Sequence, residues 1–263
     1  MPYKYRVVKE AEPQFKLLVV ATIVSIALWL ISWYLPVVGL MVYPLQLFAT
    51  FVHEASHVIA TLLTGNSVQS LTVSSDGSGA VWSQGAGTFS QLLISSAGYL
   101  GTTLYGALLL AWMRFGYPSR IALYTSAGLL VVMTVVFGFL APIINLFATV
   151  TLGSVVFTVF TGMALAAGLG AIAYFANAKW ANFALAFLAV QCLLNAIFSL
   201  VDLLFITATT SGHSDAVNMA AVSGIPAIVW VLIWFGISIL MISAGLRIYS
   251  VSKTRKADTV FED

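Results

Sequence analysis

Residues 53–57 read HEASH, which places two histidines four residues apart and a glutamate directly after the first. On an α-helix, His53 and His57 lie one turn apart on the same face, so both imidazoles can reach one metal ion. Glu54 projects from the neighbouring face, where its carboxylate can polarise a metal-bound water without being a ligand itself. The pattern therefore predicts a metal site with Glu54 as its general base.

The motif lies in a chain whose composition is typical of a membrane protein. Of its 263 residues, 60% are hydrophobic and only 8% are charged, whereas a soluble domain carries about 25% charged residues. An ionisable side chain inside a membrane span is costly and therefore indicates a functional site. The net charge of +2 gives no indication of a nucleic-acid partner. Cys192 is the only cysteine, which excludes an intramolecular disulfide and a cysteine-based zinc site.

Long apolar runs predict an all-α polytopic membrane protein, because a crossing needs roughly 20 apolar residues. We expect about seven transmembrane helices, with six as the alternative because residues 121–178 carry no charge to mark a boundary. The expected spans are residues 17–35, 40–64, 89–113, 120–140, 152–176, 181–207 and 219–247. They form a single transmembrane domain over residues 17–250, between polar tails at residues 1–16 and 251–263.

One connection between the expected spans has a composition of its own. Within residues 65–88, two short runs typical of β-strands, at residues 68–73 and 80–82, flank the turn-rich sequence SDGSG. We therefore expect a short β-hairpin between the second and third helices.

The second and third expected spans each carry a regular pattern of side chains. On the second, polar residues recur every three or four positions and form one stripe, which must face a protein interior or a wet cavity. The stripe consists of Gln46, Thr50, His53, His57, Thr61 and Thr64. On the third, Gly98, Thr102 and Gly106 follow at four-residue spacing, which we interpret as close helix packing.

A catalytic zinc ion usually takes three protein ligands and one water, so the two histidines need a partner. Asp202 is the first candidate, because it lies in the apolar run FSLVDLLFI with no basic residue nearby to pair with its charge. Its expected helix runs the same way through the membrane as the motif helix, and both groups lie late in their spans. The opposing interpretation is a protonated Asp202 that donates one hydrogen bond to a neighbouring helix.

Further polar residues are candidates for the same site. In the segment GHSDA at residues 212–216, His213 or Asp215 can be a ligand or contact the ligands at the mouth of the site. The same segment is also typical of a helix N-cap. Asn195 can orient Asp202, bind the substrate backbone, or pack as an amide between helices.

Taken together, these blocks resemble the site-2 protease class of intramembrane zinc metalloproteases, in particular its compact M50B-like branch. Three features carry the resemblance: HEASH followed by VIA and a Thr-Gly helix end, the hairpin leading into SSAGYLG, and Asp202 followed by HSDA and GIP. They cover roughly residues 45–230. The best-known members have an Asn and prolines leading into Asp-Gly. Here no proline separates Asn195 from Asp202 and no glycine follows it, so Asp215 stays as the alternative third ligand.

The resemblance implies a function and a set of roles. His53 and His57 would bind one zinc ion together with a distal Asp, and Glu54 would be the general base that activates a metal-bound water. The substrate would be a peptide bond of a membrane-embedded protein or peptide, admitted as an extended strand with the help of the hairpin.

The resemblance also implies a site near the cytoplasmic face, which favours a cytoplasmic N-terminus. Counts of Lys and Arg on seven crossings favour the opposite orientation.

Two other functions remain possible from the sequence. One is a non-proteolytic binding or regulatory membrane protein that retains the fold; the intact HEASH motif argues against it. The other is a cation or proton transporter, which requires polar residues on several helices near the midplane of the membrane. The fourth and fifth expected spans carry no charge, so we rank the transporter last.

Overall fold

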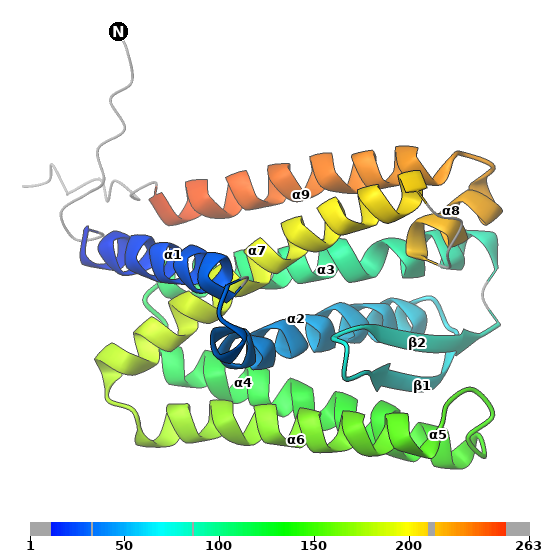
Figure 1. Ribbon diagram of the computed structural model, residues 1–263, viewed down its shortest axis with the longest axis horizontal. Helices are drawn as coiled ribbons and strands as arrows, with labels where there is room; N and C mark the ends of the chain where they lie inside the picture. The colour runs from blue at the N-terminus through cyan, green and yellow to red at the C-terminus, as the bar shows by residue number, and fades with distance from the viewer. Residues whose placement is uncertain (1–11, 33, 86, 210–213, 251–263) are drawn as a thin grey trace, which may run out of the picture.

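The computed structural model describes residues 12–32, 34–85, 87–209 and 214–250. Among these residues, the helices lie side by side along one long axis and a two-stranded sheet lies near one end (Figure 1). The helices are α1 (Glu12–Ser32), α2 (Pro36–Leu63), α3 (Thr88–Arg114), α4 (Ser119–Val132), the π-helix η1 (Met133–Leu140), α5 (Ala141–Ile144), α6 (Leu152–Phe175), α7 (Ala178–Thr209), α8 (Asp215–Ser223) and α9 (Ala227–Ser250). The strands are β1 (Ser67–Val73) and β2 (Gly79–Gln84).

Six helical segments of the described chain are long and apolar enough to cross a membrane. They are α2, α3, the continuous segment Ser119–Ile144, α6, α7 and α9, whereas α1 contributes the shorter apolar stretch Lys16–Ser32. The expected all-α polytopic fold, with one β-hairpin after the HEASH helix, is therefore confirmed, and the structure favours six crossings over seven.

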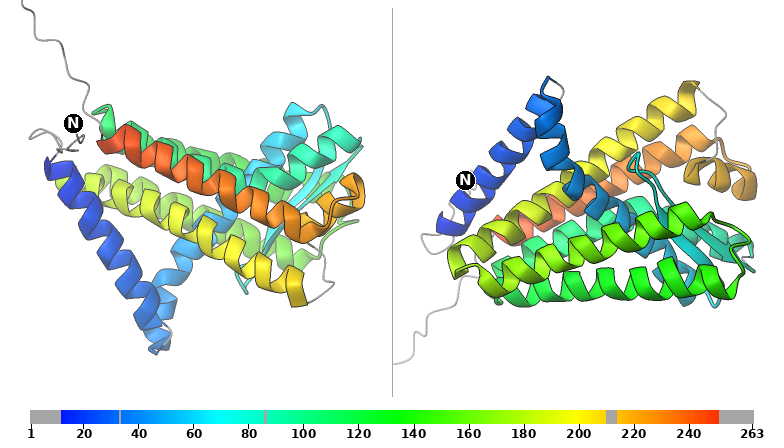
Figure 2. Two further views of the ribbon diagram at one scale, coloured as in Figure 1. Left: turned by 90° about the horizontal axis from the view of Figure 1, so that it is seen from above. Right: turned by 60° about the horizontal axis from the view of Figure 1, so that its bottom comes forward.

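The two ends of the bundle carry different parts of the chain. At what we call the terminal end, α1 and α7 begin and α3, α6 and α9 stop; at the hairpin end, β1, β2, α5 and α8 gather (Figure 1). The helices α1 and α2 form a V whose tip protrudes from the side of the bundle, and α2 continues to the hairpin end (Figure 2). Trp29 of α1 stacks on Phe198 of α7 with ring centroids 4.4 Å apart. Helices α1 and α2 together therefore extend from the terminal end of the bundle to the hairpin end (Figure 2).

The last expected span, residues 219–247, was wrong as a single helix, because the structure divides it between α8 and α9. Helix α8 ends at Ser223, and Gly224 follows it in the left-handed conformation with a φ of 72°. Pro226 then precedes α9 and has no N–H with which to continue a helix. This break separates the short α8 from the membrane-spanning α9.

The hairpin has one covered edge and one edge that borders a cavity. The strands pair antiparallel, with Leu71 opposite Val81 and Val73 opposite Gly79. The outer edge of β1 is held by helical side chains: the Val73 N–H donates to the Thr158 hydroxyl at 2.9 Å, and the Asn145 amide donates to the Gln69 carbonyl at 3.1 Å. The outer side of β2 instead lines a cavity, described below.

Two hydroxyl groups of α2 anchor the tip of the hairpin. The Tyr43 hydroxyl donates to the Ser75 carbonyl at 2.7 Å, and the Thr50 hydroxyl donates to the Gly77 carbonyl at 2.8 Å. At the tip, Asp76 accepts bonds from the Ser78 hydroxyl and N–H, which hold the pKa of its carboxyl group below its usual value. The hairpin and the HEASH helix are therefore joined as one unit.

Small residues let α3 approach both α2 and α7. A Cβ added at Gly101 would lie 2.2 Å from the Ser56 hydroxyl oxygen on α2, and one added at Gly106 would lie 2.8 Å from the Leu193 side chain on α7. The interpretation of this helix as a close-packing element is thus confirmed for Gly106. Gly98 has a different neighbour, which belongs to the site.

Candidate metal and active site

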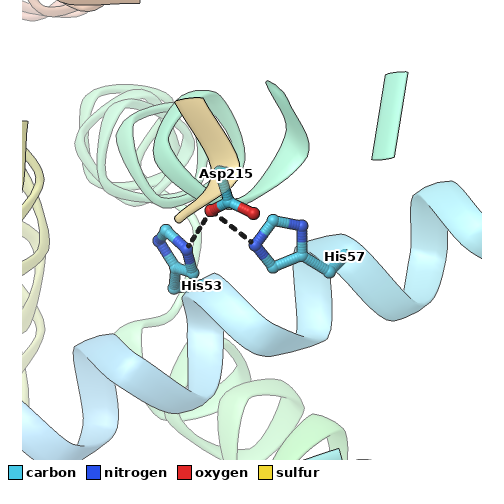
Figure 3. A group of neighbouring side chains, drawn as sticks. All are labelled: His53, His57 and Asp215. Carbon is cyan, nitrogen blue, oxygen red and sulfur yellow. Dashed lines mark ion pairs between the residues drawn. The ribbon is translucent and has the colours of Figure 1, made fainter. Parts of the chain in front are cut away.

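Three metal-ligating side chains converge near the hairpin end of the bundle. His53 and His57 lie on α2, and Asp215 is the first residue of α8. One carboxylate oxygen of Asp215 lies 3.5 Å from Nε2 of His53 and 3.4 Å from Nε2 of His57. Figure 3 shows both imidazoles directed toward this carboxylate.

The three ligand atoms lie within 4.8 Å of one another, and two of their separations match those of a zinc site. Two ligands at about 2.1 Å from a tetrahedral zinc ion lie about 3.4 Å apart, which agrees with the two observed separations. Space beside the imidazoles depends on Gly98 of α3, because a Cβ there would lie 2.2 Å from His53 Nε2 and 2.4 Å from His57 Nε2. Two imidazoles and a carboxylate are also a donor set that zinc accepts. The residues present therefore fit the ion.

A backbone carbonyl fixes the orientation of His57. Nδ1 of His57 lies 2.7 Å from the Ile94 carbonyl oxygen, which can only accept a hydrogen bond, so Nδ1 carries the proton. The lone pair of Nε2 is then free to face a metal ion. The side chain is only 6% exposed, so this orientation is held by packing as well.

An aromatic stack supports His53. The Tyr99 ring meets the His53 ring edge to face with centroids 4.6 Å apart, and it stacks on Trp234 at 5.4 Å. Trp234 is buried, and its indole N–H donates to the Ser96 hydroxyl at 3.1 Å. Only the packing of α3 against α2 and α9 brings these aromatic residues to His53, so no pattern in the sequence indicated a role for them.

Asp215 is free to act as a ligand because another residue caps its helix. The Ser214 hydroxyl accepts the Val217 N–H at 3.3 Å, so Ser214 is the N-cap that the GHSDA segment predicted. Although burial raises the pKa of the Asp215 carboxyl group, its contacts with His57 and His53 hold that pKa well below its usual value. These contacts favour the carboxylate form, which is the form that binds a metal ion.

The structure brings Asp215 to the histidines and leaves Asp202, our first candidate, away from them. Asp202 is exposed on α7, whereas its neighbours Ser199, Leu203 and Ile206 line the cavity. Asp202 itself is not among the cavity-lining residues, and it does not belong to the group whose ligand atoms lie within 4.8 Å of one another. The geometry thus favours the alternative ligand.

The remaining sequence candidates fall outside the group of three. Asn195 is half-buried on α7, and its side-chain oxygen accepts the Ser199 hydroxyl at 3.3 Å. It does not line the cavity, whereas Asn218, one turn after Asp215 on α8, does. His213 lies outside the described residues.

Separate substitution of Asp215 and of Asp202 tests which of the two aspartates is the third metal ligand. We expect Asp215→Asn to weaken zinc binding by more than about 100-fold, because even the groups that orient a ligand contribute about 10- to 100-fold. We expect Asp202→Asn, the same change at the exposed position, to keep natural zinc binding. Zinc content of the purified variants, measured by mass spectrometry against free zinc, checks both. Loss of zinc from the Asp202 variant alone would reverse the assignment.

Glu54 borders the same cavity and packs against the hairpin. Its side chain is 4% exposed, and a Cβ added at Gly79 of β2 would lie 2.5 Å from Glu54 Oε1. The cavity has a volume of about 490 Å³, and its walls come from α2, β2, α3, α7 and α8. It therefore offers room for a peptide segment between Glu54, the ligand group and the hairpin.

The contact between Gly79 and Glu54 makes a second prediction. In Gly79→Ala, the new methyl group must displace the Glu54 carboxylate, and a displacement of about 1 Å can cost about 100-fold in rate. We expect turnover to fall by about 10- to 100-fold while zinc binding is retained. Gly87→Ala is the matched control, because a Cβ there meets nothing within 4 Å. Equal activity of the two variants in a cleavage assay would contradict the contact.

A polytopic helical bundle whose HEASH helix contributes two residues to such a ligand group defines a class, the membrane metallopeptidases of the site-2 protease kind. The chain matches the family model described as Peptidase M50B-like over residues 18–245, and it therefore belongs to this family. The suspected resemblance is thus confirmed. No curated protein and no solved structure matches the chain.

Proposed function

We propose that the protein is an intramembrane zinc metalloendopeptidase that hydrolyses peptide bonds of membrane-embedded protein segments. The observation that carries this proposal is the convergence of His53, His57 and Asp215 beside Glu54 in one cavity. Membership of a peptidase family supports the reaction class, and the proposal adds the metal, the residues and the substrate environment.

Each residue has a defined task in the proposed reaction. His53, His57 and Asp215 hold the ion, which when bound supplies Lewis acidity for water and for a substrate carbonyl. Glu54 takes the proton of the attacking water and delivers it to the leaving amine. The Ile94 carbonyl keeps His57 in the tautomer that presents Nε2. Burial of Glu54 keeps bulk water from competing for this proton.

We further propose that the substrate enters as an extended strand beside β2. Helical peptide bonds are hydrogen-bonded and shielded, so the scissile segment must unwind before attack. The edge of β1 is already bonded to Asn145 and Thr158, whereas residues 79–83 of β2 line the cavity. An unwound segment can satisfy its backbone groups there by strand addition.

Removal of the metal tests the proposed function directly. In liposomes that contain the protein and a single-span reporter substrate, a zinc chelator should abolish cleavage, and added zinc should restore it. The measurement is the amount of reporter fragment at each zinc content. Full cleavage by protein whose zinc content is shown to be near zero would overturn the proposal.

Two expectations from the sequence remain part of this proposal. The first is a single transmembrane metalloprotease-like domain over residues 17–250 between polar tails. The second is a cytoplasmic N-terminus in a multi-pass membrane protein.

A further inference from the structure

Asn218 lies on α8 one turn after Asp215 of the ligand group. Side chains three residues apart on a helix share a face, with about 5–6 Å between their Cβ atoms. Both side chains line the cavity, and Asn218 is half-buried there. The Asn218 amide is therefore presented to the cavity beside the ligand group.

No partner for the side-chain amide of Asn218 lies within the part of the chain that the structure describes. The Asn218 backbone N–H donates to the Ser214 carbonyl at 2.9 Å, which is a bond of the helix itself. A primary amide offers two N–H donors and one acceptor oxygen, so Asn218 retains this capacity for a ligand. Other polar side chains of the cavity already make bonds within the protein; they are Thr50, Ser78, Gln91, Ser199 and Ser214.

Two walls of the cavity meet the HEASH helix at different residues. Gly79 of β2 packs against Glu54, whereas Asp215 of α8 approaches His53 and His57. Both α8 and β2 lie at the hairpin end of the bundle (Figure 1), and both contribute residues to the same cavity. A strand that pairs with β2 in this cavity therefore runs between β2 and α8.

A substrate strand in this place has backbone groups to satisfy on both of its edges. Pairing with β2 satisfies one edge. Groups on the other edge also need partners, since an unpaired backbone group shielded from water is costly. We propose that the Asn218 amide binds one residue on this second edge, donating to its carbonyl oxygen and accepting its N–H. This assignment rests on the proposed function and makes Asn218 a substrate-binding residue.

The contact fixes the register of the substrate strand relative to the metal ligands. Asn218 and Asp215 lie about 5–6 Å apart on α8, and a strand advances by about 3.3 Å per residue. The residue that Asn218 holds is therefore about two residues from the scissile bond. Because the bond is made to the backbone, it accepts any side chain at this position. The substrates are thus defined by the ability of a segment to unwind.

Substrate binding to Glu54→Gln protein, which we expect to leave the peptide nearly uncleaved, tests the assignment. The affinity for a fluorescent single-span peptide is measured in liposomes at saturating zinc. Asn218→Ala should weaken binding about 5- to 150-fold, the cost of leaving a buried polar group without its partner. Asn218→Gln keeps the amide and should recover part of this loss. Asn195→Ala is the matched control, because Asn195 is also half-buried but bonds to Ser199 and does not line the cavity.

Single ester bonds in the same peptide locate the contact. An ester lacks the N–H of a peptide bond, and its carbonyl oxygen is a weaker acceptor. At one position near the scissile bond, the ester should weaken binding to the Glu54→Gln protein at least about fivefold more than binding to its Asn218→Ala derivative. Additive effects of ester and alanine at every position would contradict a direct contact.

Equal peptide affinity with and without Asn218→Ala would overturn the assignment, as would an equal loss in the Asn195→Ala control. Zinc affinity should be unchanged by Asn218→Ala, because Asn218 is outside the ligand group; loss of zinc would show a structural role at the metal site instead. Cleavage by protein with the natural Glu54 is measured in parallel. If Asn218 controls peptide binding and this protein cleaves nothing, the proposed function fails and the binding assignment stands.

Discussion

A Glu54→Gln variant is expected to bind zinc as the natural protein does and to cleave its substrate about 100- to 10,000-fold more slowly. The range follows from the usual contribution of a positioned general acid or base. Glutamine has nearly the same size and fits the buried position against Gly79, but its amide cannot accept a proton from water. Because Glu54 is absent from the ligand group, the metal should stay.

The measurement is turnover of a membrane-embedded reporter together with the zinc content of the same preparation. Zinc content serves as the internal control, because a variant that had lost its fold would lose the metal as well. Natural turnover in the Glu54→Gln variant would remove Glu54 from the mechanism. Loss of both zinc and turnover would show that the substitution disrupts the site as a whole, and it would contradict the expectation that the metal stays.

The second large effect is expected from Gly98→Ala, a change of one methyl group on α3. The new Cβ would lie 2.2 Å from His53 Nε2 and 2.4 Å from His57 Nε2, where ligand and metal must meet. His57 cannot turn aside without losing its bond to the Ile94 carbonyl. We expect zinc affinity to fall by at least about 100-fold, since lesser disturbances around a metal site cost about 10- to 100-fold.

Two other helical glycines provide matched controls for this change. A Cβ at Gly128 of α4 or at Gly236 of α9 meets nothing within 4 Å. Alanine stabilises a helix by roughly 0.5–1 kcal/mol relative to glycine, so these variants should fold well and bind zinc normally. A zinc titration of the three proteins compares them directly. Natural zinc affinity in Gly98→Ala would contradict the proposed position of the ion.

The sequence predicted the parts of the site that are local in the chain. His53 and His57 had to share a helix face because their spacing is four residues, and the hairpin followed from two short β-type runs around SDGSG. The membrane crossings were predictable in the same way, because each depends on the length of one continuous apolar run. These features depend on residues that are near one another in sequence, which is why they could be derived without the fold.

The features that the sequence left open depend on how distant segments meet. Asp202 lies inside the sixth apolar run and Asp215 follows it, and only the packing of α7 and α8 against α2 decides which of the two acids meets the histidines. Gly98 looked like a packing residue because small residues at four-residue spacing serve close helices and open sites equally.

The position of Asp215 on α8 has a consequence for the protein during its synthesis. Five of the six membrane-crossing segments precede this residue, so a ribosome has made most of the chain before the ligand set is complete. Binding energy for the metal appears only with a formed site. Until α8 emerges, the nascent chain carries HEASH without its third ligand. We therefore expect the proposed peptidase to be inert toward neighbouring membrane proteins while it is being inserted, and to gain activity only when its own bundle is assembled.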